Sequence, residues 1–301
     1  MPDALTPEPA PLHNAPRRRG LRVVSSAMIV LCVLFTAFIL LILAVVTLYL
    51  VSLGGRYISL SFFTRLPIPP HMEGAPGGMK NALLGTLVLI GLASAVGIPL
   101  GVMAGVYFSE YRTRSVLAAS TRFVADVLTG VPSIVVGILG YELVVVPLGE
   151  FNGYAGAAAL AFIMIPLVAR TTEEMLLLVP HSYREASIAL GATKARTIFT
   201  VVLPSATGNI ITGVMLAIAR IAGETAPLLF TALGSRLLTL DPGHPFPSLT
   251  VQVFAYATGP YKQEQNLAWA GILILISLIF ILNLLVHLIV RSMQLPVGAH
   301  K

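Results

Sequence analysis

Charged side chains stand inside two of the most apolar stretches of this chain. The stretches read ARTTEEML and IARIAGETAPLL, and their charged residues are Arg170, Glu173, Glu174, Arg220 and Glu224. A charged group at the centre of a membrane helix costs about 2.5–3.5 kcal/mol on insertion scales, so such groups face a protein interior or a water-filled path. The sequence therefore predicts that Arg170, Glu173, Arg220 and Glu224 line a path for a charged solute.

The spacing of these charges predicts ion pairs within each helix. Arg170 stands three and four residues before its two glutamates, and Arg220 stands four residues before Glu224, so each pair meets on one helical face. One hypothesis is that the charges only neutralise each other. The other is that glutamates hold the guanidinium groups for a tetrahedral oxyanion, which the planar fork of arginine suits. Asp126 is expected to cap a helix or to pair with Arg122.

A second feature is the polar stretch EASIALGATKARTIFTVVLP, which lies between two apolar runs. Ser182 and Glu185 have the spacing of a capping box at the start of a short helix, about 183–190. Gly191 can adopt the left-handed backbone that ends such a helix. A second helix is expected from about 194, and Pro204 is expected to mark a turn back into the membrane. The pattern predicts a helix–turn–helix elbow, although an ordinary capped loop would give the same signals.

The elements that must position these groups are membrane-spanning helices. Of the 301 residues, 56% are hydrophobic and only 11% are charged, whereas soluble domains carry about 25% charged residues. Apolar runs of about twenty residues can cross a bilayer as helices. The sequence predicts six such helices in an all-α polytopic membrane protein, at roughly 25–53, 81–107, 123–147, 154–178, 205–233 and 267–290.

The positions of Lys and Arg predict the orientation. Twelve of the nineteen fall in the segments that are cytoplasmic if the N-terminus lies inside, and the positive-inside rule then places both termini and the elbow in the cytoplasm. The expected organisation is a disordered tail over 1–24, a first transmembrane helix over 25–53, a permease domain over 80–290 and a C-terminal tail over 291–301. The positive charge is thus a topology signal and does not predict nucleic-acid binding.

The elbow carries a spaced set of residues that resembles the EAA loop of ABC importer permeases. Its members are Glu185, Ala186, Gly191, Leu203 and Pro204, with Ser187 and Val201 as small departures from the family pattern. The resemblance implies a MetI-like permease core in which the elbow is a coupling helix that docks on a separate ATPase. The chain itself has no GxxxxGK[ST] phosphate loop, so it is not expected to bind or hydrolyse ATP.

Further runs, LTGVPSIVVGILG, ALGATK and GETAPL, resemble one of the two permease subunits of phosphate-specific ABC importers. The resemblance implies inorganic phosphate as the solute and alternating access as the mechanism. It implies three kinds of partner in a bacterial inner membrane: the second permease PstC, two copies of the ATPase PstB, which would hold ATP and Mg²⁺, and a periplasmic or lipid-anchored phosphate-binding protein, PstS. In that family, charged residues at the positions of Arg170, Glu173 and Arg220 are implicated in phosphate passage.

Other functions are less compatible with the sequence. The only cysteine is Cys32 and the six histidines are scattered, so no cofactor, metal site or catalytic residue is expected in this chain. A membrane-embedded enzyme would need a cluster of catalytic side chains, and a passive channel would not need the elbow. A permease for another oxyanion, such as sulfate or molybdate, remains the alternative.

Overall fold

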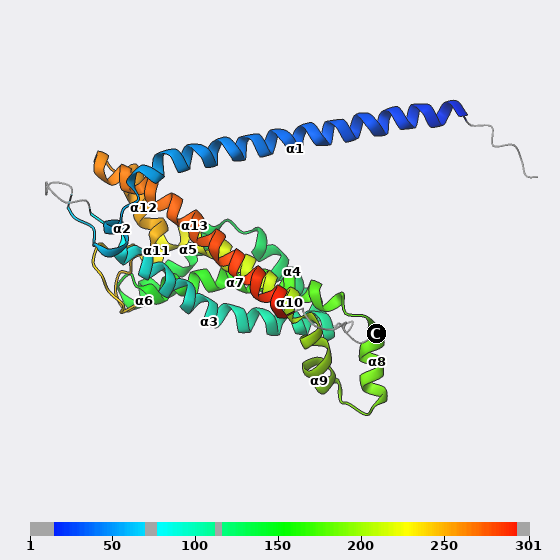
Figure 1. Ribbon diagram of the computed structural model, residues 1–301. Helices are drawn as coiled ribbons and strands as arrows, with labels where there is room; N and C mark the ends of the chain where they lie inside the picture. Colours follow the sequence, from blue (N-terminus) through cyan, green and yellow to red (C-terminus); the bar gives the residue numbers. More distant parts are fainter. Residues whose placement is uncertain (1–14, 70–76, 112–115, 294–301) are drawn as a thin grey trace, which may run out of the picture. The chain divides into compact units, whose positions relative to one another are not determined.

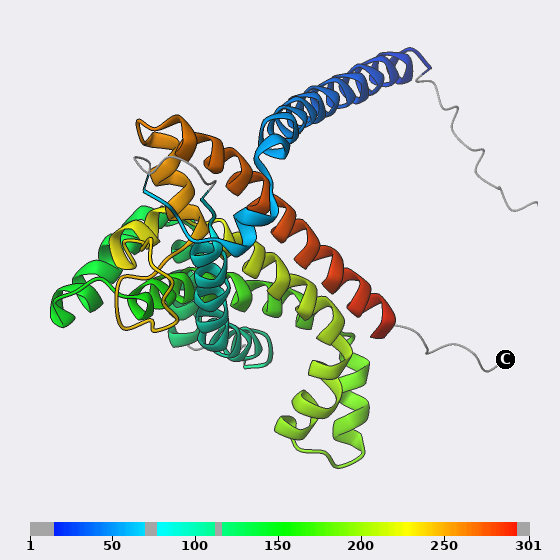
Figure 2. The same ribbon diagram turned by 60° about the vertical axis from the view of Figure 1, so that its left-hand side comes forward.

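The computed structural model describes residues 15–69, 77–111 and 116–293, which are almost wholly helical (Figures 1 and 2). Within those ranges the β-structure is a single isolated bridge between Leu233 and Phe246. The chain divides into two compact units, Met1–Ser52 and Leu53–Lys301. The helical content confirms the predicted all-α class.

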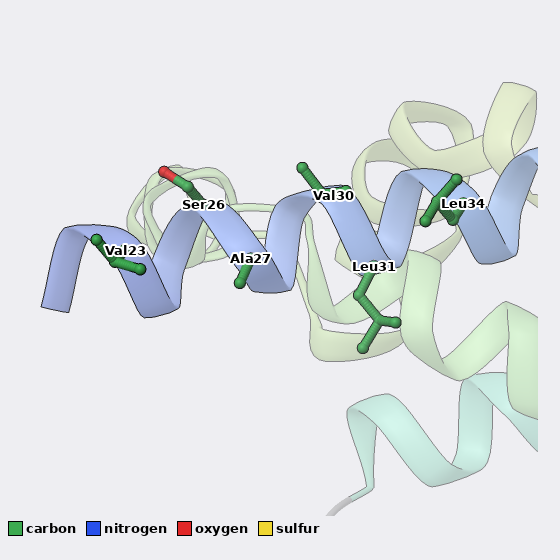
Figure 3. A pocket seen from close by; sticks show the side chains of 6 residues that line it. All are labelled: Val23, Ser26, Ala27, Val30, Leu31 and Leu34. Carbon is green, nitrogen blue, oxygen red and sulfur yellow. The ribbon is translucent and has the colours of Figure 1, made fainter. Parts of the chain in front are cut away.

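The first unit consists of most of helix α1, Ala15–Tyr57. Its apolar part begins at Val23, and none of the side chains in its most apolar window is buried within the chain. Figure 3 shows an open apolar depression on this helix, lined by Val23, Ser26, Ala27, Val30, Leu31 and Leu34. Because one helix supplies the whole lining, this surface suits contact with lipid. The helix starts ahead of the predicted span, so residues 15–24 are helical, while 1–14 lie outside the described residues.

The second unit contains the remaining helices. They are α2 Leu60–Thr64, α3 Lys80–Glu110, α4 Val116–Gly130, α5 Ser133–Gly140, the π-helical turn η1 Tyr141–Val145, α6 Val146–Leu148, α7 Gly153–Leu177, α8 His181–Ala189, α9 Lys194–Thr197, the π-helical turn η2 Ile198–Val202, α10 Leu203–Ala222, α11 Ala226–Thr231, α12 Leu249–Thr258 and α13 Lys262–Met293. Five helices of the described chain are long and apolar enough to cross a membrane, or six if one bent pair counts as a span.

The bent pair is the predicted third span, 123–147, which is not one continuous helix. The segments Ser120–Gly130 and Ser133–Leu148 meet at an angle of 105°. Pro132, which caps α5, has no N–H to donate and disfavours a helical backbone in the residue before it. The chain therefore leaves the helix at Gly130 and starts a new one.

The predicted fifth span, 205–233, is also interrupted. Helix α10 ends at Ala222, and α11 starts at Ala226 with Pro227 in its first turn. Helices α5 and α11, which each follow an interruption, pack against each other. A Cβ at Gly137 of α5 would lie 2.8 Å from the Cα of Pro227, so glycine is what permits this close approach. Two helix breaks thus come together inside the permease domain.

Pro204 does not mark a turn, contrary to the prediction. The helix runs from α9 through η2 into α10, and the Leu203 N–H bonds the Ile198 carbonyl five residues back. A π-helical hydrogen bond of the same kind precedes Pro147, where the Val146 N–H bonds the Tyr141 carbonyl five residues back. A proline ring collides with the carbonyl four residues earlier. A π-helical turn relieves that collision without ending the helix.

Helices α3 and α7 form the closest pair in the bundle. Gly97, Gly101 and Gly105 of α3 lie against Met164, Val168 and Thr172 of α7, as the four-residue spacing of small residues predicts. A Cβ at Gly105 would lie 2.6 Å from the carbonyl oxygen of Ala169, which is backbone and cannot move aside easily. The two helices therefore pack nearly backbone to backbone.

We expect Gly105→Ala to destabilise the permease by about 1–3 kcal/mol, because the added methyl overpacks the α3–α7 contact. The matched control is Gly91→Ala on the same helix, where a Cβ would have no neighbour within 4 Å. Both changes gain the same helix propensity, so the difference between them isolates the steric effect. Thermal unfolding in detergent measures it, and equal midpoints would contradict the close packing.

Candidate functional site

Glu173 is the buried centre of a charge cluster between α4 and α7. Only 5% of its side chain is exposed, and its Oε1 lies 2.7 Å from Nη2 of Arg122 on α4. Its Oε2 lies 3.4 Å from Nη1 of Arg170, which confirms one predicted pair. Arg122 also donates to the carbonyl oxygen of Phe108, near the end of α3 that is predicted to be cytoplasmic. One carboxylate thus joins two guanidinium groups from different helices.

Arg170 contacts three carboxylates in all. Its Nε lies 3.1 Å from Oε1 of Glu174, as predicted, and its Nη1 lies 3.8 Å from Oδ1 of Asp126. The expected pair of Asp126 with Arg122 is therefore replaced by one with Arg170, while Arg122 turns to Glu173. The cluster holds two arginines and three acidic residues. This excess of carboxylate means that the cluster as a whole does not attract an anion.

Arg220 is held much more loosely. Its Nε lies 3.9 Å from Oε1 of Glu224, half of its side chain is exposed, and 16% of the Glu224 side chain is exposed. Arg220 stands in the last turn of α10, where the helix dipole favours a cation. The predicted pair is therefore present, but the guanidinium keeps donors that no side chain of the described residues fills at short range.

A small cavity lies beside Arg220 at the break between α4 and α5. Its polar lining residues are Thr129, Ser133 and Arg220, and its apolar ones are Leu128, Val131, Val136, Phe162, Ile163 and Leu167. Its volume of about 20 Å³ is room for one water molecule. The first turn of α5 begins at Ser133, so unpaired backbone N–H groups and the positive end of a helix dipole lie at the same place as the guanidinium. The arrangement favours a small anion.

The elbow is present and projects from one end of the bundle as the hairpin of α8 and α9 (Figures 1 and 2). Gly191, with φ of +84°, has the predicted left-handed backbone. The predicted capping box is wrong: α8 starts at His181 after Pro180, and no side chain caps it. Proline at the cap position fixes the entry into the helix two residues earlier than predicted, so Ser182 already lies within the first turn. Thr193 caps α9 by accepting from the Arg196 N–H.

A hydrogen bond joins the two helices of the elbow, and apolar side chains are exposed on its surface. Ser187 on α8 hydrogen-bonds Thr197 on α9 at 2.9 Å. Leu190 at the tip is 89% exposed, and Tyr183, Ile188 and Phe199 are more than half exposed. Glu185 and Ala186 are exposed on α8, whereas Leu203 is partly buried at the start of α10. An exposed apolar tip on a helical hairpin suits a protein interface.

We expect Gly191→Val to impair transport strongly while Gly191→Asn retains most of it. The left-handed backbone costs an ordinary residue about 1–2 kcal/mol, and Asn tolerates it better than a β-branched residue. No atom lies within 4 Å of a Cβ at this position, so backbone strain and not crowding distinguishes the two variants. Solute uptake at equal membrane abundance measures the effect. Equal uptake by the two variants would show that the bend at Gly191 is dispensable.

Sequence reasoning missed three residues that organise these sites: Arg122, Glu110 and Arg184. Arg122 was predicted to be cytoplasmic and to be one alternative partner of Asp126, Arg184 was predicted only to be cytoplasmic, and no role was predicted for Glu110. Their contacts join residues 51 and 74 positions apart in sequence, as the numbering of Arg122–Glu173 and Glu110–Arg184 shows. Local spacing carries no signal for such pairs.

Comparison with known proteins bears on these features. Residues 97–295 match the family model "Binding-protein-dependent transport system inner membrane component". The chain belongs to this family. The matched segment of the permease contains the charge cluster around Glu173, the Arg220–Glu224 pair, both helix breaks and the elbow. Family membership confirms the predictions of an ABC importer permease and of a subunit that is not itself an enzyme.

Two relatives of the permease carry the name "Phosphate transport system permease protein PstA". The protein of Yersinia pestis is 47% identical over 239 residues, which are 79% of this chain and 80% of that protein. The protein of Haemophilus influenzae is 42% identical over 239 residues, which are 79% of this chain and 84% of that protein. The predicted resemblance to permeases of phosphate-specific importers is confirmed.

Two solved structures share the fold of the permease. An inward-facing MetNI methionine ABC transporter has a TM-score of 0.53 at 20% identity, covering 71% of this chain and 94% of that chain. A bacterial ABC transporter involved in the import of alginate has a TM-score of 0.63 at 11% identity, covering 92% of this chain and 99% of that chain. These similarities confirm the MetI-like permease architecture.

Proposed function

We propose that this permease moves inorganic phosphate into a bacterial cell across the inner membrane by alternating access. The family match and the names of the relatives support this function. The observation that carries it is Arg220, a half-exposed and loosely paired guanidinium in a predicted membrane span, beside the break between α4 and α5. Broken helices whose ends face a cavity are a common way to bind a charged solute inside a membrane.

Arg220 and Glu224 form the part of the path that contacts the anion most directly. A phosphate oxygen accepts from the guanidinium, from the hydroxyl of Ser133 and from the first turn of α5. Protonated phosphate also carries an O–H group, and Glu224 can accept from it because Arg220 holds this carboxylate only loosely. A fully deprotonated anion such as sulfate has nothing to donate. The pair therefore favours phosphate over other oxyanions.

Arg170 and Glu173 form a second part of the path at another depth. Thr171, the neighbour of Arg170 on α7, lies against Gly213 of α10. Gly213 stands seven residues before Arg220, which is about 10 Å along the helix at 1.5 Å per residue. Arg170 is 44% exposed and can meet a passing anion, while the buried Glu173 holds it in place against Arg122. The excess of carboxylate in this cluster discourages an anion from resting there.

The transporter is completed by other subunits. Arg170, Glu174, Asp126 and Arg220 leave about half of their side chains exposed, which lipid would not accept. A second permease, PstC, covers this face and closes the path. Two copies of the ATPase PstB hold ATP and Mg²⁺ and receive the apolar tip of the elbow, with Glu185, Ala186 and Gly191 in the docking segment. A periplasmic or lipid-anchored phosphate-binding protein, PstS, delivers the solute.

In this arrangement both termini and the elbow are cytoplasmic. The N-terminal tail precedes a first transmembrane helix over 25–53, a permease domain extends over 80–290, and a short tail follows from 291. The excess of Lys and Arg in the corresponding loops supports the orientation.

The test is uptake of radiolabelled phosphate, with sulfate as competitor, in cells that lack their own PstA. We expect the chain to restore uptake that excess sulfate does not reduce. If the chain restores sulfate uptake but not phosphate uptake, it is a permease for another oxyanion and the phosphate assignment is wrong. No uptake of either ion at normal membrane abundance, with the partner subunits present, would contradict the proposed function.

A further inference from the structure

Arg184 joins the elbow to the ends of two membrane helices. Its Nη2 and Nε lie 2.6 and 3.1 Å from Oε1 of Glu110, the last residue of α3, and Nε also lies 3.3 Å from Oε2. The same guanidinium donates to the carbonyl oxygen of Leu176 in the last turn of α7, at 2.9 Å, and to that of Val179 just after α7, at 2.7 Å. Both charged side chains are nearly buried, with 14% of Arg184 and 7% of Glu110 exposed.

The second arm of the elbow contacts the same end of α3. Lys194, the first residue of α9, donates from Nζ to the carbonyl oxygen of Glu110 at 2.6 Å. Its ammonium group also lies 4.2 Å from the ring centre of Tyr111. Both arms therefore hold one turn of α3, and the hydrogen bond between Ser187 and Thr197 holds the arms together. A multidentate, nearly buried contact of this kind is stiff, unlike an exposed ion pair.

The contact reaches a helix that the elbow does not adjoin in sequence. The elbow follows α7 and leads into α10, so movement of the elbow reaches these two helices through the chain itself. Helix α3 receives it only through packing and through the contacts that Arg184 and Lys194 make with Glu110 and Tyr111. The junction with α10 passes through η2 and Pro204, where the regular hydrogen-bond ladder is interrupted.

We propose that Glu110 and Arg184 are positioning residues for transport, through which displacement of the elbow moves the inner end of α3 together with α7. This rests on the proposed function in so far as the elbow is the part that an ATPase moves. Because α3 and α7 are packed backbone to backbone at Gly101 and Gly105, a displacement entering at Glu110 carries the pair as one body. Without the contact, α10 still follows the elbow, whereas the α3–α7 pair is linked to the elbow mainly through the turn at 178–180 and lags behind α10.

The experiment uses the transporter purified with its native partner subunits, in lipid, with Cys32→Ser as background. Spin labels are placed on Met103→Cys of α3 or Leu216→Cys of α10, whose native side chains are 60% and 61% exposed. Spectra are recorded with and without a non-hydrolysable ATP analogue. We expect both labels to respond in the background protein. In Glu110→Ala the response at α3 falls at least twofold while the response at α10 remains.

The variant Arg184→Ala should match Glu110→Ala at the α3 label, and the double variant should lose no more than either single one, because the two residues act as a unit. If Glu110→Ala fails to assemble with the partner subunits, Glu110→Gln is measured in its place. An unchanged α3 response in these variants overturns the proposal, as does an α3 label that never responds. Phosphate uptake by the background protein is measured in parallel. Absent uptake with intact label responses would contradict the phosphate assignment alone.

Discussion

Arg220→Gln is expected to lower phosphate uptake by about 10- to 100-fold without lowering the amount of permease in the membrane. Hydrogen bonds to charged groups contribute about 1.5–3 kcal/mol each, and every 1.4 kcal/mol is a tenfold effect. The side chain is half exposed and its Nε lies 3.9 Å from Oε1 of Glu224, beyond hydrogen-bond distance, so its removal breaks no hydrogen bond between the two residues. The loss should therefore appear in transport and not in stability. Uptake at several phosphate concentrations measures it.

Two controls sharpen this result. Arg220→Lys keeps the charge but loses the planar fork, so it should retain intermediate uptake. Arg65→Gln removes an exposed arginine of the segment after α2, away from both charge clusters, and should keep normal uptake. Normal uptake by Arg220→Gln would mean that the Arg220–Glu224 pair is structural and that the anion passes elsewhere.

Glu173→Gln is expected to destabilise the permease by about 3–5 kcal/mol, the usual cost of removing one partner of a buried ion pair. The carboxylate is 5% exposed and meets both Arg122 and Arg170, so the amide would leave two guanidinium groups short of negative charge. Thermal unfolding in detergent and the quantity of permease recovered from membranes measure the loss. Uptake should fall in proportion to that quantity.

The neighbouring carboxylate supplies the comparison. Glu174 contacts the same arginine, but 52% of its side chain is exposed, so Glu174→Gln should cost less than about 1 kcal/mol. Two adjacent glutamates on one helix would then differ severalfold in energetic effect, because Glu173 is buried and meets a second arginine. If the two variants have equal stability, the buried cluster around Glu173 is not what joins α4 to α7.

The sequence by itself determined a large part of this protein. Apolar runs of sufficient length predicted the membrane helices, because an unsatisfied backbone in lipid leaves a chain little choice but to be helical. Helical spacing predicted that Arg170 meets Glu173 and Glu174, and that Arg220 meets Glu224. Gly191 predicted the bend of the elbow, since only glycine adopts that backbone without strain. Each of these signals acts within a few residues.

Only the tertiary structure decided how those local pieces divide their roles. Spacing could not distinguish a tightly held arginine from an available one. Arg122 and Asp126 of α4 reach the cluster around Arg170. In the described chain, no charged side chain other than Glu224 reaches Arg220. Pro132 and Pro204 each stand between an aliphatic residue and a serine, yet the helix before Pro132 ends and the helix around Pro204 continues through a π-helical turn. The contact of Glu110 with Arg184 likewise depends on where α3 ends in space. Packing between segments that are distant in sequence determines which charges are covered and which contacts form. Local spacing carries no information about that packing.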